Sequence, residues 1–130
     1  MYKRQIIHKS KIDSYKPDLA IQAGPRLIAN YKPLKIKDKD TRTRRSGIAI
    51  TNKDEVIIYA TLLRFPGASF LEVQEMLTSL NIKDALNFDG GSSSQLYLKK
   101  NPALDDDFLI SGGDDIPVAL IVKKTPKKQY

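Results

Sequence analysis

Apolar residues along the chain fall mainly into short, β-branched runs that predict strands rather than helices. Residues 46–51 and 55–63 are two such runs, and the polar stretch 52–54 between them indicates a hairpin. Other runs predict strands at residues 2–8, 19–23, 26–30, 85–88, 94–98 and 118–122. The last run is continuously apolar, which is typical of a central strand.

One segment, residues 69–80, has helical spacing instead. Ser69 is a candidate N-cap and Glu72 follows three residues later, which is the pattern of a capping box. Asn81 is the predicted stop. The order strand, helix, strand over residues 55–89 predicts a βαβ unit and places Asp89 at the carboxyl end of a strand, where α/β sheets bind ligands. We therefore expect a mixed α/β fold, with a mixed sheet and one principal helix.

Length and composition limit the architecture further. With 130 residues and 41% hydrophobic content, residues 1–130 should form a single compact domain. Cysteine is absent, which excludes disulfides, a thiol nucleophile and cysteine metal sites. The acidic clusters at residues 105–107 and 112–115 lack EF-hand spacing, so we expect loops there and predict no metal or cofactor. No apolar run reaches the roughly 20 residues of a membrane span, and no export signal is recognisable, so the compartment stays open.

The net charge of +7 favours anionic partners: phosphate groups, nucleic acid or an acidic polymer. The few aromatic residues are not interleaved with the basic ones, which makes a nucleic-acid partner the weaker prediction. The charges are densest in residues 32–45, where we expect an exposed loop or a solvated hairpin, and in a basic tail at 123–130.

The candidate site lies in residues 84–97, which read DALNFDGGSSSQLY. A short buried strand would deliver Asp89 into two glycines and three serines. Glycines let the backbone approach a ligand closely, and N–H groups and hydroxyls can face an anion. The stretch therefore suits chemistry on a phosphorylated molecule. The alternative is a tight turn between two strands, with Asp89 as a turn acceptor.

Three separated motifs occur in a characteristic order: QAGPRLI at residues 22–28, RSGIAIT at 45–51 and ALNFDGG at 85–91. This order resembles the phosphodiester glycosidase family, which includes N-acetylglucosamine-1-phosphodiester α-N-acetylglucosaminidase. The resemblance covers about residues 18–122. It implies a hydrolase that cleaves sugar-1-phosphodiester bonds, with a phosphorylated sugar or glycan as partner, in a family whose members are often exported or envelope-associated.

The resemblance also implies roles for individual residues. Asp89 and Arg45 are the candidate catalytic residues: Asp89 is the carboxylate that acts as nucleophile or base, and Arg45 holds the departing phosphate. The remaining candidate substrate-binding residues are Gln22, Arg26, Ser46, Asn87, Gly90, Gly91, Ser92 and Ser93. Arg26 and Arg45 have surface ion pairing as an alternative role. Glu72 is better explained as a helix cap than as an acid, and His8 lies outside the resemblance.

The chain departs from the family pattern in three places. Ser92 stands where a third glycine is usual, and Ser46 and Gly47 stand where threonine and alanine are usual. The family's N-terminal half, with an Asn-Gly-Gly-Phe-like motif, is not in this sequence. We therefore expect a partly open groove at Asp89, completed by a homo-oligomer or by a complementary N-terminal chain. The alternative function is a non-catalytic module that binds phosphorylated glycan.

Overall fold

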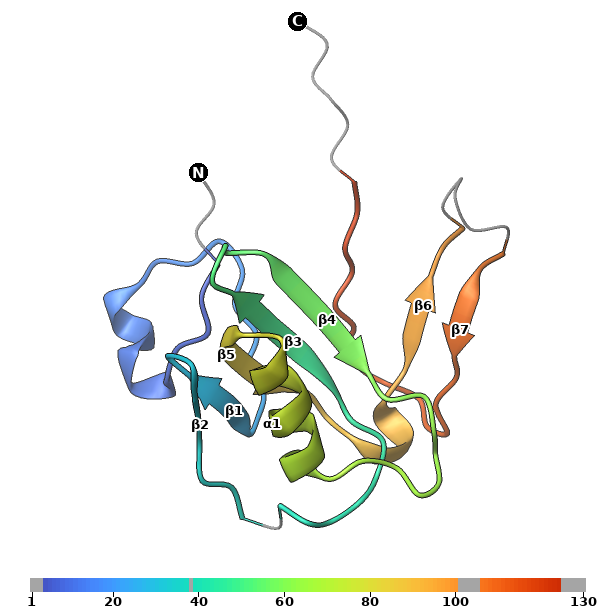
Figure 1. The fold of residues 1–130 in the computed structure, drawn as a ribbon. Coiled ribbons are helices and arrows are strands. Elements are labelled where there is room, and N and C mark those ends of the chain that lie inside the picture. Colours follow the sequence, from blue (N-terminus) through green and yellow to red (C-terminus); the bar gives the residue numbers. More distant parts are fainter. Residues whose placement is uncertain (1–3, 38, 101–105, 125–130) are drawn as a thin grey trace, which may run out of the picture.

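The structure, a computed structural model, describes residues 4–37, 39–100 and 106–124. It is built on a five-stranded sheet with the order β2-β1-β5-β3-β4, with helix α1 packed on one face (Figure 1). A two-stranded sheet, β6-β7, stands beside it. The elements in chain order are η1 (Lys9–Ser14), β1 (Arg26–Ala29), β2 (Lys32–Pro33), β3 (Ser46–Thr51), β4 (Val56–Ala60), α1 (Phe70–Ser79), β5 (Ile82–Asn87), η2 (Gly91–Ser93), β6 (Leu96–Leu98) and β7 (Phe108–Ile110).

The predicted mixed α/β class with one principal helix is confirmed, whereas the predicted mixed sheet is not. Every described pairing in the large sheet is antiparallel. Strands β4 and β5 run in the same direction on either side of the helix, as a βαβ unit requires, but β3 lies between them. The hairpin β3–β4 therefore inserts an antiparallel strand where sequence order alone suggested a parallel pair.

Helix α1 begins as its sequence predicts. The Ser69 hydroxyl accepts from the Glu72 N–H at 3.2 Å, and the Glu72 carboxylate accepts from the Ser69 N–H at 2.8 Å. Asn81 ends the helix with φ of 55°, the left-handed conformation that asparagine tolerates. The helix packs on the sheet through a core of Leu27, Ile28, Ala49, Tyr59, Val73, Leu77, Ile82 and Ala85. Among the described residues, no helix has the length and apolarity needed to cross a bilayer.

Five predicted strands are confirmed: 46–51 with its predicted ends, and 26–30, 55–63, 85–88 and 94–98 with shifted ends. Strand β4 stops at Ala60, and the exposed Leu62 and Leu63 lie beyond it. Strand β5 starts earlier than predicted, at Ile82, because Ile82 pairs with Thr51 and is buried in the core.

Three other strand predictions are wrong. Residues 4–8, 19–23 and 118–122 have no strand conformation, and residues 2–3 of the first run lie outside the described part. The error at 118–122 is the largest, because this apolar run is exposed instead of central. Apolar composition alone forms no strand without a neighbouring edge to pair with. Conversely, the short stretch between the acidic clusters forms β7, which pairs with β6.

Candidate functional site

The antiparallel topology brings the end of β5 beside the start of β3. The Phe88 N–H donates to the Ser46 carbonyl at 2.7 Å, and the Ser46 hydroxyl donates to the Asp89 carbonyl at 3.2 Å. Two motifs that are about 40 residues apart in sequence therefore meet at one end of the sheet. This juxtaposition defines the candidate site.

The segment Asp89–Ser93, called the Asp89 loop below, leaves the sheet immediately after β5. Its carboxylate is exposed and accepts from the Gly90 N–H at 3.0 Å. Gly91 has φ of +64°, which favours glycine, and its N–H donates to the Arg44 carbonyl at 3.0 Å. Buried Ser94 anchors the end of the loop through its hydroxyl, which donates to the Asp89 carbonyl at 3.4 Å.

Gly90 lies against the chain that leads into β3. A Cβ at this position would stand 3.0 Å from the Arg44 carbonyl oxygen and 3.6 Å from Arg45 Nη1. Standard backbone dimensions then place the Arg45 guanidinium within about 9 Å of the Asp89 Cα. The structure thus brings the carboxylate, the glycines and Arg45 together.

Arg45 is buried, at 6% exposure, and is held from several sides. Its Nε donates to the Ala68 carbonyl at 3.2 Å and its Nη2 to the Thr41 carbonyl at 2.7 Å, while the guanidinium stacks on Phe70 with its carbon 3.7 Å from the ring centroid. Burial lowers the pKa of Arg45, but an arginine remains charged at any physiological pH. Among the described residues, no carboxylate pairs with it and Nη1 makes no hydrogen bond. A buried cation without a counter-ion favours an anion at its open side.

Beneath the loop lies a polar pair of which the sequence singled out Asn87 but not Tyr59. The Tyr59 hydroxyl donates to Asn87 Oδ1 at 3.4 Å, and burial raises the pKa of Tyr59, an effect that nearby Arg45 opposes. Gly47 makes room for this tyrosine, since a Cβ there would stand 2.4 Å from its hydroxyl. Tyr59 sits in an ordinary strand pattern, so no motif could have identified it.

Asn87 is closed off from solvent, at 2% exposure, and its Nδ2 donates to the Phe88 carbonyl. It supports the loop from below. Two other candidates are not brought to the loop: Arg26 pairs with Asp84 at 2.5 Å, and Gln22 is exposed in the irregular segment before β1. The described contacts link neither of them to the Asp89 loop.

The serines of the loop have different environments. Ser92 Oγ donates to the Asp114 carboxylate, and the Ser92 carbonyl accepts from the Gly113 N–H at 2.8 Å. Gln95 Nε2 donates to the Asp114 carbonyl at 2.8 Å. Residues 112–114 therefore clamp the loop from outside, a contact hidden in what the sequence presented as a solvated acidic stretch. The hydroxyl of Ser93 has no hydrogen-bond partner in the described part of the chain.

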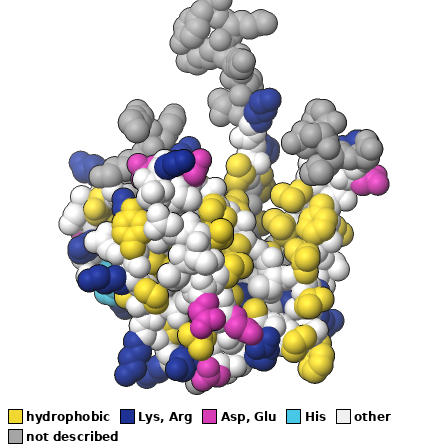
Figure 2. Space-filling model, in the orientation of Figure 1, with side chains coloured by type: hydrophobic (Ala, Val, Ile, Leu, Met, Phe, Trp, Pro, Cys, Tyr) yellow, Lys and Arg dark blue, Asp and Glu magenta, His cyan; other side chains and the backbone are white. Residues whose placement is uncertain are grey.

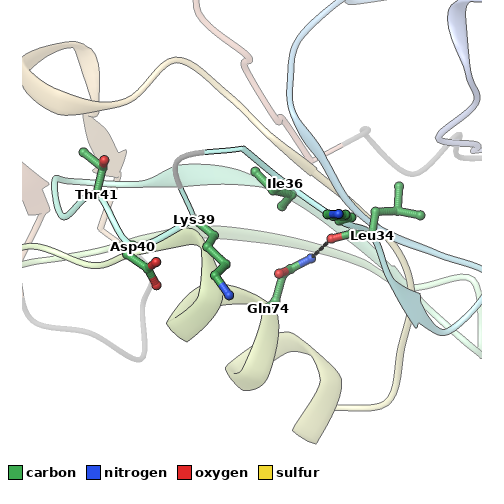
Figure 3. A pocket seen from close by; sticks show the side chains of 7 residues that line it. Leu34, Ile36, Lys39, Asp40, Thr41 and Gln74 are labelled. Atoms are coloured by element: carbon green, nitrogen blue, oxygen red, sulfur yellow. Dashed lines mark hydrogen bonds between the residues drawn. The ribbon is translucent and has the colours of Figure 1, made fainter.

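Two surface hollows lie elsewhere. One, of about 600 Å³, is lined by Leu34, Lys35, Ile36, Lys39, Asp40, Thr41 and Gln74 (Figure 3). Its buried amide, Gln74 Nε2, already donates to the carbonyls of Leu27 and Leu34, each at 2.8 Å. The other, of about 810 Å³, lies between residues 4–7 and the turn after β3. Neither is lined by the Asp89 loop, so the candidate site is not part of these hollows.

Among residues 4–37, 39–100 and 106–124, no three histidine or carboxylate side chains are grouped so as to hold a metal ion. Two carboxylates at the loop each accept a hydrogen bond: Asp114 accepts from Ser92 Oγ, and Asp89 accepts from the Gly90 N–H. Beside the loop, the described side chains offer the Asp89 carboxylate and the Arg45 guanidinium.

Comparison with known proteins identifies a family. The family model described as phosphodiester glycosidase matches residues 3–123. A crystal structure of a hypothetical protein from Synechocystis is 32% identical with a TM-score of 0.48, and the match covers 54% of this chain but 15% of that chain. This chain thus corresponds to a small part of that protein's length. A comparison with curated proteins found no match. Because the family model spans nearly all of its residues, the chain belongs to the phosphodiester glycosidase family.

Proposed function

We propose that this domain binds a sugar-1-phosphodiester at the Asp89 loop and hydrolyses the bond between the anomeric carbon and the phosphate oxygen. The observation that carries the proposal is the buried Arg45 guanidinium, whose Nη1 faces Gly90 and lacks a counter-ion among the described residues. A guanidinium fork matches phosphate oxygens. Asp89, one residue from Gly90, supplies the carboxylate in this proposal.

The proposed mechanism divides the work between these groups. The leaving group is a phosphate monoester, already stable as an anion, so a strong general acid is less necessary than in ordinary glycoside hydrolysis. Asp89 acts on the oxocarbenium-like carbon as nucleophile, or as the base for water. Arg45 Nη1 and the hydroxyl of Ser93 hold the departing phosphate.

Several candidates take supporting roles in this proposal. The N–H groups of Gly90 and Gly91 are already used by Asp89 and Arg44, so these glycines shape the loop and allow close approach. Asn87 and Ser46 position the loop from below. Gln22 and Arg26 would contact the sugar only after a rearrangement that brings them to the loop.

The test is release of free reducing sugar from an aryl phosphodiester of N-acetylglucosamine. Asp89→Asn keeps size and turn geometry but removes the negative charge, and we expect at least about a hundredfold loss of hydrolysis. Asp18→Asn, an exposed site in the N-terminal segment, is the matched control and should retain full activity. Hydrolysis that survives in Asp89→Asn would contradict the proposal.

The alternative is a non-catalytic module that binds phosphorylated glycan, and the exposure of Asp89 favours it. Calorimetric titration with the same phosphodiester distinguishes the two functions. No hydrolysis by the parent, combined with binding that Arg45→Lys weakens, would establish the module. If the parent shows neither hydrolysis nor binding, both functions are excluded.

A further inference from the structure

Strand β4 is one edge of the five-stranded sheet, and no described strand pairs with its outer side. Hydrogen bonds to the β3 side occur at odd-numbered positions: Thr61 N–H donates to the Arg45 carbonyl and Thr51 N–H to the Glu55 carbonyl. By antiparallel alternation, the backbone groups of the even-numbered residues point outward. These outward residues are Val56, Ile58 and Ala60.

Strand β4 itself carries none of the usual features that prevent pairing with another strand. Proteins usually blunt an edge with charges, proline or a bulge, and β4 contains none of these. Val56 and Ile58 are also 37% and 40% exposed, so the outward backbone groups are flanked by accessible apolar side chains. The edge is therefore a template for an apolar strand.

A matching segment exists in residues 118–122, which read VALIV. Val118, Ile121 and Val122 are more than 70% exposed, and the segment makes no main-chain hydrogen bond within the described part of the chain. Figure 1 shows it as an irregular chain leaving the body of the molecule, and Figure 2 shows hydrophobic side chains gathered where it and the β6–β7 hairpin lie. Its composition is typical of a strand, yet it lacks a partner.

We propose that residues 118–122 of one copy form an antiparallel strand on the β4 edge of a second copy, reciprocally, so that two copies form a closed dimer. The charged residues that flank the two segments favour the antiparallel direction. With Leu120 opposite Ile58, an antiparallel strand sets Lys123 and Lys124 opposite Glu55 and Asp54. A parallel strand would carry both lysines past the other end of β4, away from these carboxylates.

The clamp on the Asp89 loop explains why a second copy is the occupant. Residues 112–114 are held by Ser92 and Gln95, so the segment starts from a fixed root. From that root it makes no hydrogen bond to its own β4 in the structure, and Pro117 limits how the intervening residues can turn. A second copy can approach the edge without this constraint.

Because the chain has no cysteine, disulfide trapping tests the pairing directly. Val56→Cys and Val122→Cys proteins, carrying different tags, are mixed and mildly oxidised. The antiparallel register places these two positions opposite each other, within disulfide range, and predicts a covalent heterodimer. Val56→Cys mixed with Val118→Cys is the control for the parallel register and should yield little product.

Two outcomes of the trapping experiment would overturn the proposal. One is a better yield from the Val56 and Val118 pair. The other is a disulfide that forms only within single chains of a Val56→Cys/Val122→Cys double variant, because it would show that the segment pairs with its own edge.

Light scattering, which measures the mass of the protein in solution, tests the dimer independently. The parent should have the mass of a dimer, and Leu120→Lys should weaken association at least about tenfold without changing the far-UV spectrum. Leu19→Lys, exposed at 77% in the N-terminal segment, is the matched control and should remain dimeric. A monomeric parent at all concentrations, or equal dissociation by both variants, would refute the proposal.

Discussion

Arg45 shows how much of this site depends on one side chain. Its neighbours are backbone carbonyls and an aromatic ring, which satisfy hydrogen bonds without neutralising the charge. The rigid surroundings fix the guanidinium plane, so the open Nη1 has one orientation towards Gly90. This is the arrangement that preorganised anion binding needs.

Replacing Arg45 by lysine should therefore damage both stability and function. A lysine ammonium cannot donate to both the Ala68 and Thr41 carbonyls and also present an N–H group on the side of Gly90. Because hydrogen bonds of the buried cation are lost, we expect a loss of about 2 kcal/mol in unfolding free energy. Hydrolysis should fall by about a hundredfold or more. Denaturant titration and the sugar-release assay measure these effects. Arg42→Lys, an exposed ion-pair site, should change stability by less than about 0.5 kcal/mol.

Gly47 is required by its surroundings rather than by its own backbone angles. A Cβ would stand 2.3 Å from the Leu86 carbonyl oxygen and 2.4 Å from the Tyr59 hydroxyl. Gly47→Ala should cost about 3 kcal/mol, measured by denaturant titration, because neither neighbour can move freely. Gly24→Ala, where nothing lies within 4 Å, should stay within about 0.5 kcal/mol of the parent. Equal stability of the two variants would contradict this packing.

At the scale of elements, α1 depends on its capping box and on the Arg42–Glu72 pair at 2.7 Å. The Ser69 backbone N–H, together with Arg42, lowers the pKa of Glu72 from its usual 4.5. A carboxylate whose pKa falls on folding stabilises the native state above its unfolded pKa. That contribution is lost as the pH falls through the lowered folded value.

Glu72→Gln should therefore be less stable than the parent near pH 7, and the difference should shrink below about pH 4.5. Denaturant midpoints measured near pH 7 and near pH 3 check this sign. A difference that stays constant with pH would mean that the glutamate acts only by its hydrogen bonds. Leu77→Ala provides the comparison, because its loss comes from buried apolar packing and should be independent of pH.

At the scale of the whole molecule, the core lies between α1 and one face of the sheet, and residues 118–122 contribute nothing to it. Truncation after Pro117 should leave the far-UV spectrum of the remaining chain unchanged, because no described element is removed. Leu77→Ala, a fully buried core position, should lose about 3 kcal/mol in unfolding free energy. If the truncated chain unfolds, residues 118–122 do contribute to the stability of the core, and this prediction is wrong.

Local sequence determined the features that depend on a few neighbouring residues. The capping box at Ser69 and Glu72, the stop at Asn81 and the β3–β4 hairpin all follow from short-range hydrogen bonding and side-chain period, which act within one turn or one strand. The resemblance of residues 85–91 to a glycosidase motif also belongs to this level, and the family match confirms it.

Only the tertiary structure decided which edges pair and what each polar group meets. Sheet order placed β3 between β4 and β5, because strand pairing depends on long-range contacts that no local pattern encodes. The same packing set Arg45 beside Gly90, drew Arg26 to Asp84, buried Asn87 under Tyr59 and tied Ser92 to Asp114. An apolar run such as residues 118–122 specifies a tendency to pair, but the availability of an edge determines whether and with which chain it does so.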